Sequence, residues 1–125
     1  WIYVDDHVNA LCQIIQKASP GKKYCLGGNS ERTNIDVVKN ICSILDEIKP
    51  SDRNYSELIK FVKDRPGHDN RYAIDSSKIK QEIGWSPNYN FEVTLKKTVQ
   101  WYIKNQKWCN KILKKSGYDK KRIGI

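Results

Sequence analysis

The helical spacing of apolar residues is the feature that most constrains how this chain folds. Apolar side chains recur at i, i+3, i+4 and i+7, the spacing typical of a helix with one buried face. We predict helices over residues 4–18, 35–48 and 91–114, and a shorter one over residues 76–83. The predicted buried face of the first helix consists of Val8, Leu11, Cys12, Ile15 and Ala18.

Local signals mark where these helices begin and end. Thr33 or Asn34 is the expected N-cap of the second helix, because short polar side chains accept hydrogen bonds from the first free backbone N–H groups. Asp75 or Ser76 has the same role before the third helix, and Gly84 ends it.

Two apolar runs, residues 23–26 and 58–62, are predicted to be short strands, and Gly27-Gly28 ends the first. Residues 50–57 form a polar loop with room for one helical turn. Two or three strands and four helices indicate a small mixed α/β unit. We find no inner domain boundary and treat residues 1–125 as one lobe, with a basic tail at residues 111–125.

Residues 64–75 combine the groups that a phosphorylated ligand would need. Arg65 offers a planar fork of donors for phosphate oxygens, and Asp64 and His68 can bind hydroxyl groups. Pro66 fixes its own φ, and Gly67 allows a turn or the close approach of a ligand. These features suit a nucleotide or a phosphorylated sugar. A solvated loop whose charges pair with one another is the alternative.

The formal net charge of +9 raises the question of nucleic acid. Residues 102–125 have eight Lys and Arg residues and one Asp, so most of the excess lies in this last part of the chain. The sequence has no helix-turn-helix pattern, zinc-finger spacing or aromatic RNA-binding signature. It also has no apolar run near the roughly 20 residues of a membrane span. We therefore expect neither nucleic acid nor a membrane as partner.

The four cysteines are widely spaced, and three lie in apolar-periodic runs: Cys12, Cys25, Cys42 and Cys109. Buried free thiols fit this spacing better than a disulfide framework or a metal site. They favour a reducing compartment, the cytoplasm. With His7 and His68 as the only histidines, a histidine-rich metal site is unsupported.

The chain begins on Trp1 without a methionine, which suggests a fragment whose upstream part is missing. It has no G-x-G-x-x-G run, no P-loop, and no tyrosine followed four residues later by lysine. A complete dinucleotide site and a Tyr-x-x-x-Lys oxidoreductase centre are therefore not predicted. Trp85, Trp101 and Trp108 are interpreted as packing anchors.

Several runs together resemble, in the same order, the C-terminal part of the dTDP-glucose 4,6-dehydratase family, extended short-chain dehydrogenases/reductases that act on nucleotide sugars. The matching runs are residues 1–7, 24–28, 34–38, 64–75, 84–87 and 97–102. Gly-Trp-x-Pro at 84–87 is also found in UDP-galactose 4-epimerases. Asp-Arg-Pro-Gly-His at 64–68, followed by Arg-Tyr-Ala-Ile-Asp at 71–75, points more narrowly to the dehydratases.

The resemblance implies a lobe that binds dTDP-glucose beside an N-terminal Rossmann domain outside this chain. That domain would bind NAD and hold the catalytic residues, so no catalytic residue is expected here and the fragment alone is expected to be inactive. The family oxidises glucose at C4, removes water across C5 and C6, and returns the hydride to C6. By resemblance, Asn34 contacts the diphosphate. The nucleotide and its phosphates are lined by Asp64, Arg65, Pro66, Gly67 and His68.

Some alternatives stay open. The lobe could serve another nucleotide-sugar epimerase or dehydratase, which the upstream catalytic residues would decide. A basic nucleic-acid-binding or interaction module is the alternative from another class. The complete enzyme could form a homodimer, and the lysine-rich end departs from the family.

Overall fold

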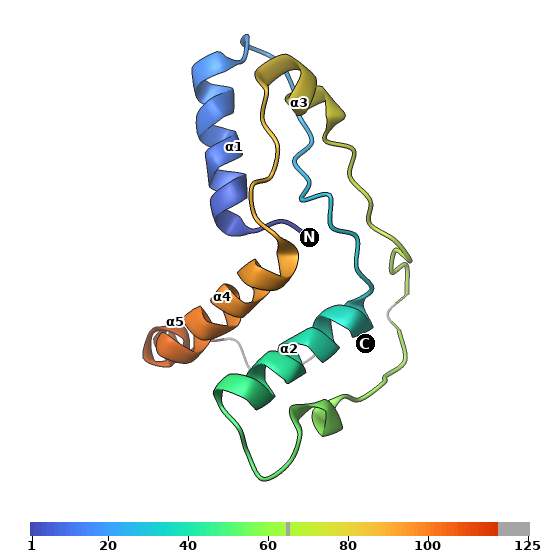
Figure 1. Ribbon diagram of the computed structural model, residues 1–125, viewed down its shortest axis with the longest axis vertical. Helices are drawn as coiled ribbons and strands as arrows, with labels where there is room; N and C mark the ends of the chain where they lie inside the picture. The colour runs from blue at the N-terminus through green and yellow to red at the C-terminus, as the bar shows by residue number, and fades with distance from the viewer. Residues whose placement is uncertain (65, 118–125) are drawn as a thin grey trace.

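The computed structural model describes residues 1–64 and 66–117. In order along the chain, its elements are α1 (Val4–Lys17), α2 (Asn34–Ile48), the 3-10 helix η1 (Tyr55–Leu58), α3 (Ser77–Ile83), α4 (Phe91–Lys104) and α5 (Gln106–Ser116). α1 packs on α3 at one end of the molecule, and α2 packs on α4 and η1 at the other. Long extended segments connect the two ends (Figure 1).

The helices predicted over residues 4–18, 35–48 and 76–83 are confirmed as α1, α2 and α3. The predicted signals at the start of α2 and at both ends of α3 are confirmed too. Thr33 is the N-cap of α2, where its side chain accepts the Asp36 N–H. α3 has Ser76 at its N-cap position, and the Asp75 carboxylate accepts the Ser77 N–H at 2.8 Å. Gly84 ends α3 with a φ of +79°, a left-handed conformation that glycine adopts without steric cost.

The prediction of one helix over residues 91–114 is wrong. α4 ends at Lys104 and α5 begins at Gln106, with Asn105 between them. The Asn105 side chain donates to the Trp101 carbonyl at 2.8 Å. Side chains that bond to nearby backbone groups in this way make asparagine more common at helix ends than in helix interiors.

The strands predicted at residues 23–26 and 58–62 are not formed, and the described residues contain no β-strand. Both runs are largely extended, but Leu58 ends η1. A strand is completed only by the ladder of hydrogen bonds to a neighbouring strand. The mixed α/β lobe is therefore not confirmed, and the described part of the chain is helical with extended connections.

The hydrophobic core lies between α1, α3 and the segment after α3. Its buried members are Ala10, Ile79, Ile83 and Trp85. Partly buried apolar side chains surround them: Ile2, Ile14, Ala18, Tyr24 and Leu26. Of the three tryptophans predicted to anchor packing, only Trp85 is buried, whereas Trp101 and Trp108 are about half exposed.

The predicted buried face of α1 is mostly exposed. Val8 is 51% exposed and Ile15 is 83% exposed, whereas Asp6 and Ala10 are buried on the opposite side. The helix is amphipathic as predicted, but the described core contacts the side that carries Ala10 and Ile14. We call Val4, Val8, Leu11 and Ile15 the α1 apolar stripe.

The cysteine prediction is confirmed in one part and wrong in another. All four cysteines are free thiols, but only Cys42 is buried, and Cys12 and Cys25 are exposed. Cys12 lies on the exposed side of α1 and Cys25 on an extended segment. Apolar spacing alone therefore wrongly predicted that these two side chains are buried. Within the described ranges, none of the helices has the length and apolar character needed to cross a bilayer.

Candidate functional site

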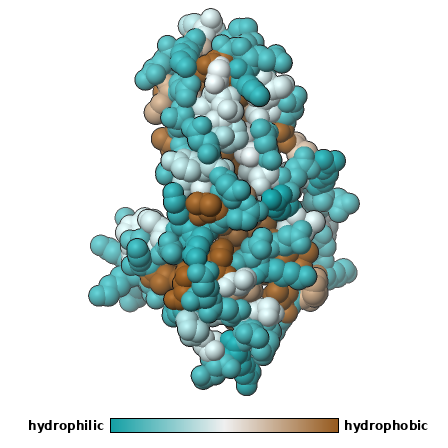
Figure 2. All heavy atoms as spheres, viewed as in Figure 1, coloured by the Kyte–Doolittle hydropathy of each residue, from teal (hydrophilic) through white to brown (hydrophobic). Residues whose placement is uncertain are grey.

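A cleft of about 1170 Å³ lies between the N-terminal segment, α2 and α4. Its walls are mainly apolar and aromatic, and include Trp1, Tyr3, Tyr89, Phe91 and Trp101. Hydrophobic side chains also reach the surface of the half of the molecule that holds α2 and α4 (Figure 2). The few polar groups at the cleft include Asn34, Asp5 and Lys97. An apolar hollow with few polar groups is the usual form of a small-molecule site.

Asn34 is the first residue of α2 and lines the cleft. Thr33 provides the helix cap: its Oγ1 accepts the Asp36 N–H at 3.2 Å and donates to the Asp36 carboxylate at 2.5 Å. The Asn34 amide is therefore not needed as the cap. It lies where a helix N-terminus favours an anion.

The loop of Asp64, Pro66, Gly67 and His68 lies outside the cleft lining. His68 Nδ1 is 2.7 Å from Asp64 Oδ1, so the two predicted hydroxyl-binding residues pair with each other. Gly67 has a φ of +68°, which explains a glycine at this turn. Arg65 is outside the described residues. Asn34 and this loop therefore do not share one cavity.

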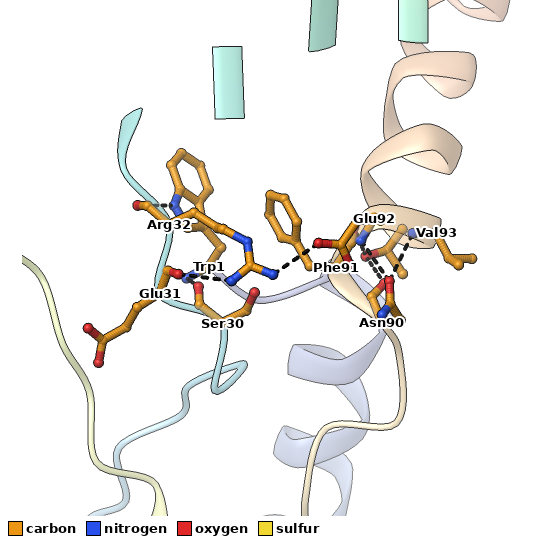
Figure 3. A network of polar contacts seen from close by, with 9 residues as sticks. Trp1, Ser30, Glu31, Arg32, Asn90, Phe91, Glu92 and Val93 are labelled. Atoms are coloured by element: carbon orange, nitrogen blue, oxygen red, sulfur yellow. Dashed lines mark hydrogen bonds and ion pairs between the residues drawn. The ribbon is translucent and has the colours of Figure 1, made fainter. Parts of the chain in front are cut away.

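Residues 28–33, which we call the connector loop, lead into Asn34 and are held by contacts that the sequence did not predict. The Trp1 indole donates to the Arg32 carbonyl at 3.4 Å, and Arg32 Nη2 is 2.9 Å from Glu92 Oε1 (Figure 3). The Arg32 guanidinium, which donates to this carboxyl, lowers the pKa of Glu92 from its ordinary value of 4.5. These contacts join the start of the chain and the start of α4 to the connector loop.

The connector loop also contacts the segment that follows the Asp64 loop. Arg71 Nη2 and Nε lie 2.7 and 3.2 Å from the same oxygen, Oε2 of Glu31. The Ser76 hydroxyl donates to the Asn29 side chain at 3.3 Å. Arg71 belongs to the charged stretch singled out in the sequence, but its partner lies 40 residues earlier, and no local pattern could reveal it.

Gly27 and Gly28 are explained by close packing of extended segments. A Cβ atom at Gly28 would lie 2.0 Å from the Trp1 carbonyl oxygen, and one at Gly27 would lie 3.3 Å from Ile74. Only a residue without a Cβ fits this approach at Gly28. Gly28 therefore allows the N-terminal segment and the connector loop to meet at the cleft, and Gly27 allows close packing against Ile74.

Asp6 is a second polar residue whose role the sequence did not reveal. It is 2% exposed, and its carboxylate accepts the backbone N–H groups of Asn88 and Tyr89. Tyr89 lines the cleft and meets Tyr3 edge to face, with ring centroids 5.4 Å apart. Burial, followed by the negative charge of Asp5, raises the pKa of Tyr3 above 10.0. His7, on the same helix, is exposed.

The sequence of this chain matches a known protein family. Residues 1–98 match the family model described as GDP-mannose 4,6 dehydratase. The chain therefore belongs to this family of nucleotide-sugar dehydratases. The described residues contain no cluster of three or more potential metal ligands.

Among curated relatives, dTDP-glucose 4,6-dehydratase of Escherichia coli is 50% identical over all of this chain and 35% of its own length. A probable dTDP-glucose 4,6-dehydratase of Sinorhizobium fredii is 49% identical, with the same coverage. The crystal structure of Bacillus anthracis dTDP-glucose 4,6-dehydratase in complex with NAD aligns with a TM-score of 0.74 and 42% identity, over 86% of this chain and 32% of that one. This chain thus spans about a third of the length of these relatives.

Proposed function

We propose that this chain is the nucleotide-sugar-binding lobe of a dTDP-glucose 4,6-dehydratase. The observation that carries the proposal is 45–50% identity to dTDP-glucose 4,6-dehydratases over 99–100% of the chain. The proposed reaction converts dTDP-glucose to dTDP-4-keto-6-deoxyglucose. The lobe would have the mixed α/β architecture of an extended short-chain dehydrogenase/reductase when joined to its Rossmann domain.

In this proposal Asn34 and the Asp64 loop bind the substrate from two sides. Asn34 would donate to the diphosphate at the start of α2, where the helix dipole adds to the attraction. Arg65 would bind phosphate oxygens, and Asp64 and His68 would orient sugar or base groups. Pro66 and Gly67 would shape the turn that brings these side chains to the ligand.

The residues of this chain would bind and orient the substrate and exclude water, and the chemistry would be carried out by the Rossmann domain. NAD, bound there, would accept the hydride from C4 and return it to C6. This chain has no glycine-rich dinucleotide loop and no Tyr-x-x-x-Lys pair, so we assign it neither the cofactor nor the catalytic residues. Holding the sugar in one orientation is a substantial contribution to such a reaction.

Two apolar surfaces support the Rossmann domain as the partner. The α1 apolar stripe is exposed, with Ile15 at 83%, and the large cleft beside α2 and α4 is lined mainly by apolar and aromatic side chains. Exposed apolar surface of this kind is usually covered by a partner. The relatives are about three times as long as this chain, so they contain a segment that could cover it. A homodimer of the complete enzyme stays a prediction, as does a cytoplasmic location, which the four free thiols support.

A chimera tests the proposed function. This chain would replace the matching third of the E. coli dTDP-glucose 4,6-dehydratase, and product formation would be measured with dTDP-glucose, UDP-galactose and GDP-mannose. We expect 4-keto-6-deoxy sugar from dTDP-glucose and much less turnover of the other two. The host enzyme is the positive control, and the host without its matching third is the negative control.

Preference for another nucleotide sugar would reassign the substrate within the family. A folded chimera that contains NAD but turns over none of the three would contradict the proposed function.

A further inference from the structure

The two parts of the proposed substrate site are connected by one ion pair. Glu31 lies three residues before Asn34, and Arg71 lies three residues after His68. Arg71 directs Nη2 and Nε at Oε2 of Glu31, at 2.7 and 3.2 Å. The pair therefore joins the connector loop to the segment that continues the Asp64 loop.

The other contacts of the connector loop make it a firm support for such a link. Trp1 donates through its indole to the Arg32 carbonyl at 3.4 Å. Arg32 reaches Glu92 at the start of α4 and lies 5.5 Å from the centroid of the Phe91 ring. Glu31 thus belongs to a loop that is also bonded to the N-terminal segment and to the start of α4.

The Asp64 loop and the segment that follows it lie at the surface of the molecule. Asp64, Pro66 and Gly67 are exposed, as are most residues from 69 to 74. The Ser76–Asn29 hydrogen bond connects the same two segments, but closer to α3 than to His68. The Asp64–His68 contact lies within the loop itself, whereas the Glu31–Arg71 pair joins the segment that follows the loop to the connector loop.

We propose that Glu31 and Arg71 are positioning residues, which hold the Asp64 loop at the distance from Asn34 that the nucleotide sugar requires. This inference rests on the proposed function. Both side chains are more than half exposed, so their pairing adds little to the stability of the fold. Its effect would appear in substrate binding, because misplaced binding groups lose affinity even when the fold is intact.

The test measures KM and kcat for dTDP-glucose in the chimera carrying Glu31→Gln or Arg71→Gln. We expect each variant to raise KM about two- to fivefold with kcat and NAD content nearly unchanged, as loss of an exposed charge pair predicts. The charge-swapped double variant, Glu31→Arg with Arg71→Glu, should recover part of the lost affinity. Glu47→Gln is the matched control, because Glu47 pairs with Lys96 between α2 and α4, away from both segments.

Each result decides the proposal. If Glu31→Gln leaves KM unchanged while Arg71→Gln raises it, Arg71 binds substrate directly and the positioning role is overturned. An equal rise in KM for Glu47→Gln would show a general effect of surface charge and would also overturn it. If the chimera turns over dTDP-glucose, either of these two KM results overturns only the positioning role, and the proposed function stands. A parent chimera without turnover of dTDP-glucose overturns the proposed function, and this inference with it.

Discussion

The Oδ1 atom of Asp6 lies 3.0 Å from the backbone nitrogen of Asn88, and this hydrogen bond ties the first turn of α1 to the segment between α3 and α4. Oδ2 of the same carboxylate accepts the Tyr89 N–H at 3.3 Å. One buried side chain thus satisfies two backbone donors at the edge of the cleft.

We expect Asp6→Ala to lower the free energy of unfolding by about 1–3 kcal/mol, because it leaves backbone donors without an acceptor. Asp6→Asn keeps one acceptor oxygen and should lose less. Urea unfolding of the purified chain, followed by tryptophan fluorescence, measures both variants. Asp5→Asn is the control, since Asp5 is exposed in the same turn. Equal stability of Asp6→Ala and the parent would refute the role of Asp6.

Gly28→Ala should destabilise the chain by about 1–3 kcal/mol, the typical cost of overpacking. The new Cβ would lie 2.0 Å from the Trp1 carbonyl oxygen, and a backbone atom has little freedom to move away. Gly27→Ala provides the comparison, because its Cβ would meet Ile74 at 3.3 Å and needs only a small adjustment. Unfolding curves that rank Gly27→Ala as the more damaging change would contradict this packing.

The Arg32–Glu92 contact predicts a pH dependence for the connector loop. The pKa of Glu92 is lowered from 4.5 in the folded state, so the contact stabilises the fold fully above pH 4.5. This stability is lost as the pH falls through the lowered pKa. In an NMR titration, Glu92 should titrate below 4.5, and Arg32→Gln should move its pKa part of the way back. A Glu92 pKa that Arg32→Gln does not change would argue against the contact.

The fold was predictable where its signals are local. Thr33 and Gly84 terminate helices through their own chemistry, so α2 and α3 were placed correctly. The Asn105 break was missed because asparagine is tolerated within many helices. The predicted strands failed because their residues have apolar side chains but no ladder partner among the described residues.

The candidate site was predictable only in part, for the same reason. The sequence singled out Asn34 and the residues of the Asp64 loop by their chemistry. The Glu31–Arg71 and Asp6–Asn88 contacts join residues 40 and 82 positions apart, which no pattern in one sequence can pair. The α1 periodicity predicted an apolar face, but it could not tell that the described core packs on the side that carries Ala10 and Ile14.

The purified 125-residue chain should neither bind NAD appreciably nor form a 4-keto-6-deoxy sugar from dTDP-glucose. The physical reason is that its sequence has no glycine-rich dinucleotide loop and no Tyr-x-x-x-Lys pair. Equilibrium dialysis with NAD and an overnight assay with dTDP-glucose measure the two properties. The chimera is the positive control, and product formation by the chain alone would refute the division of roles.

The most direct test of the nucleotide-sugar lobe is the dissociation constant of dTDP-glucose for the chimera and its Arg65→Ala variant. Removing a charge-assisted hydrogen bond costs about 1.5–3 kcal/mol. We therefore predict roughly ten- to a hundredfold weaker binding with NAD affinity unchanged, and only partial recovery in Arg65→Lys, which lacks the planar fork. Unchanged dTDP-glucose affinity in a folded Arg65→Ala chimera would contradict the account and return the Asp64 loop to a solvated surface turn.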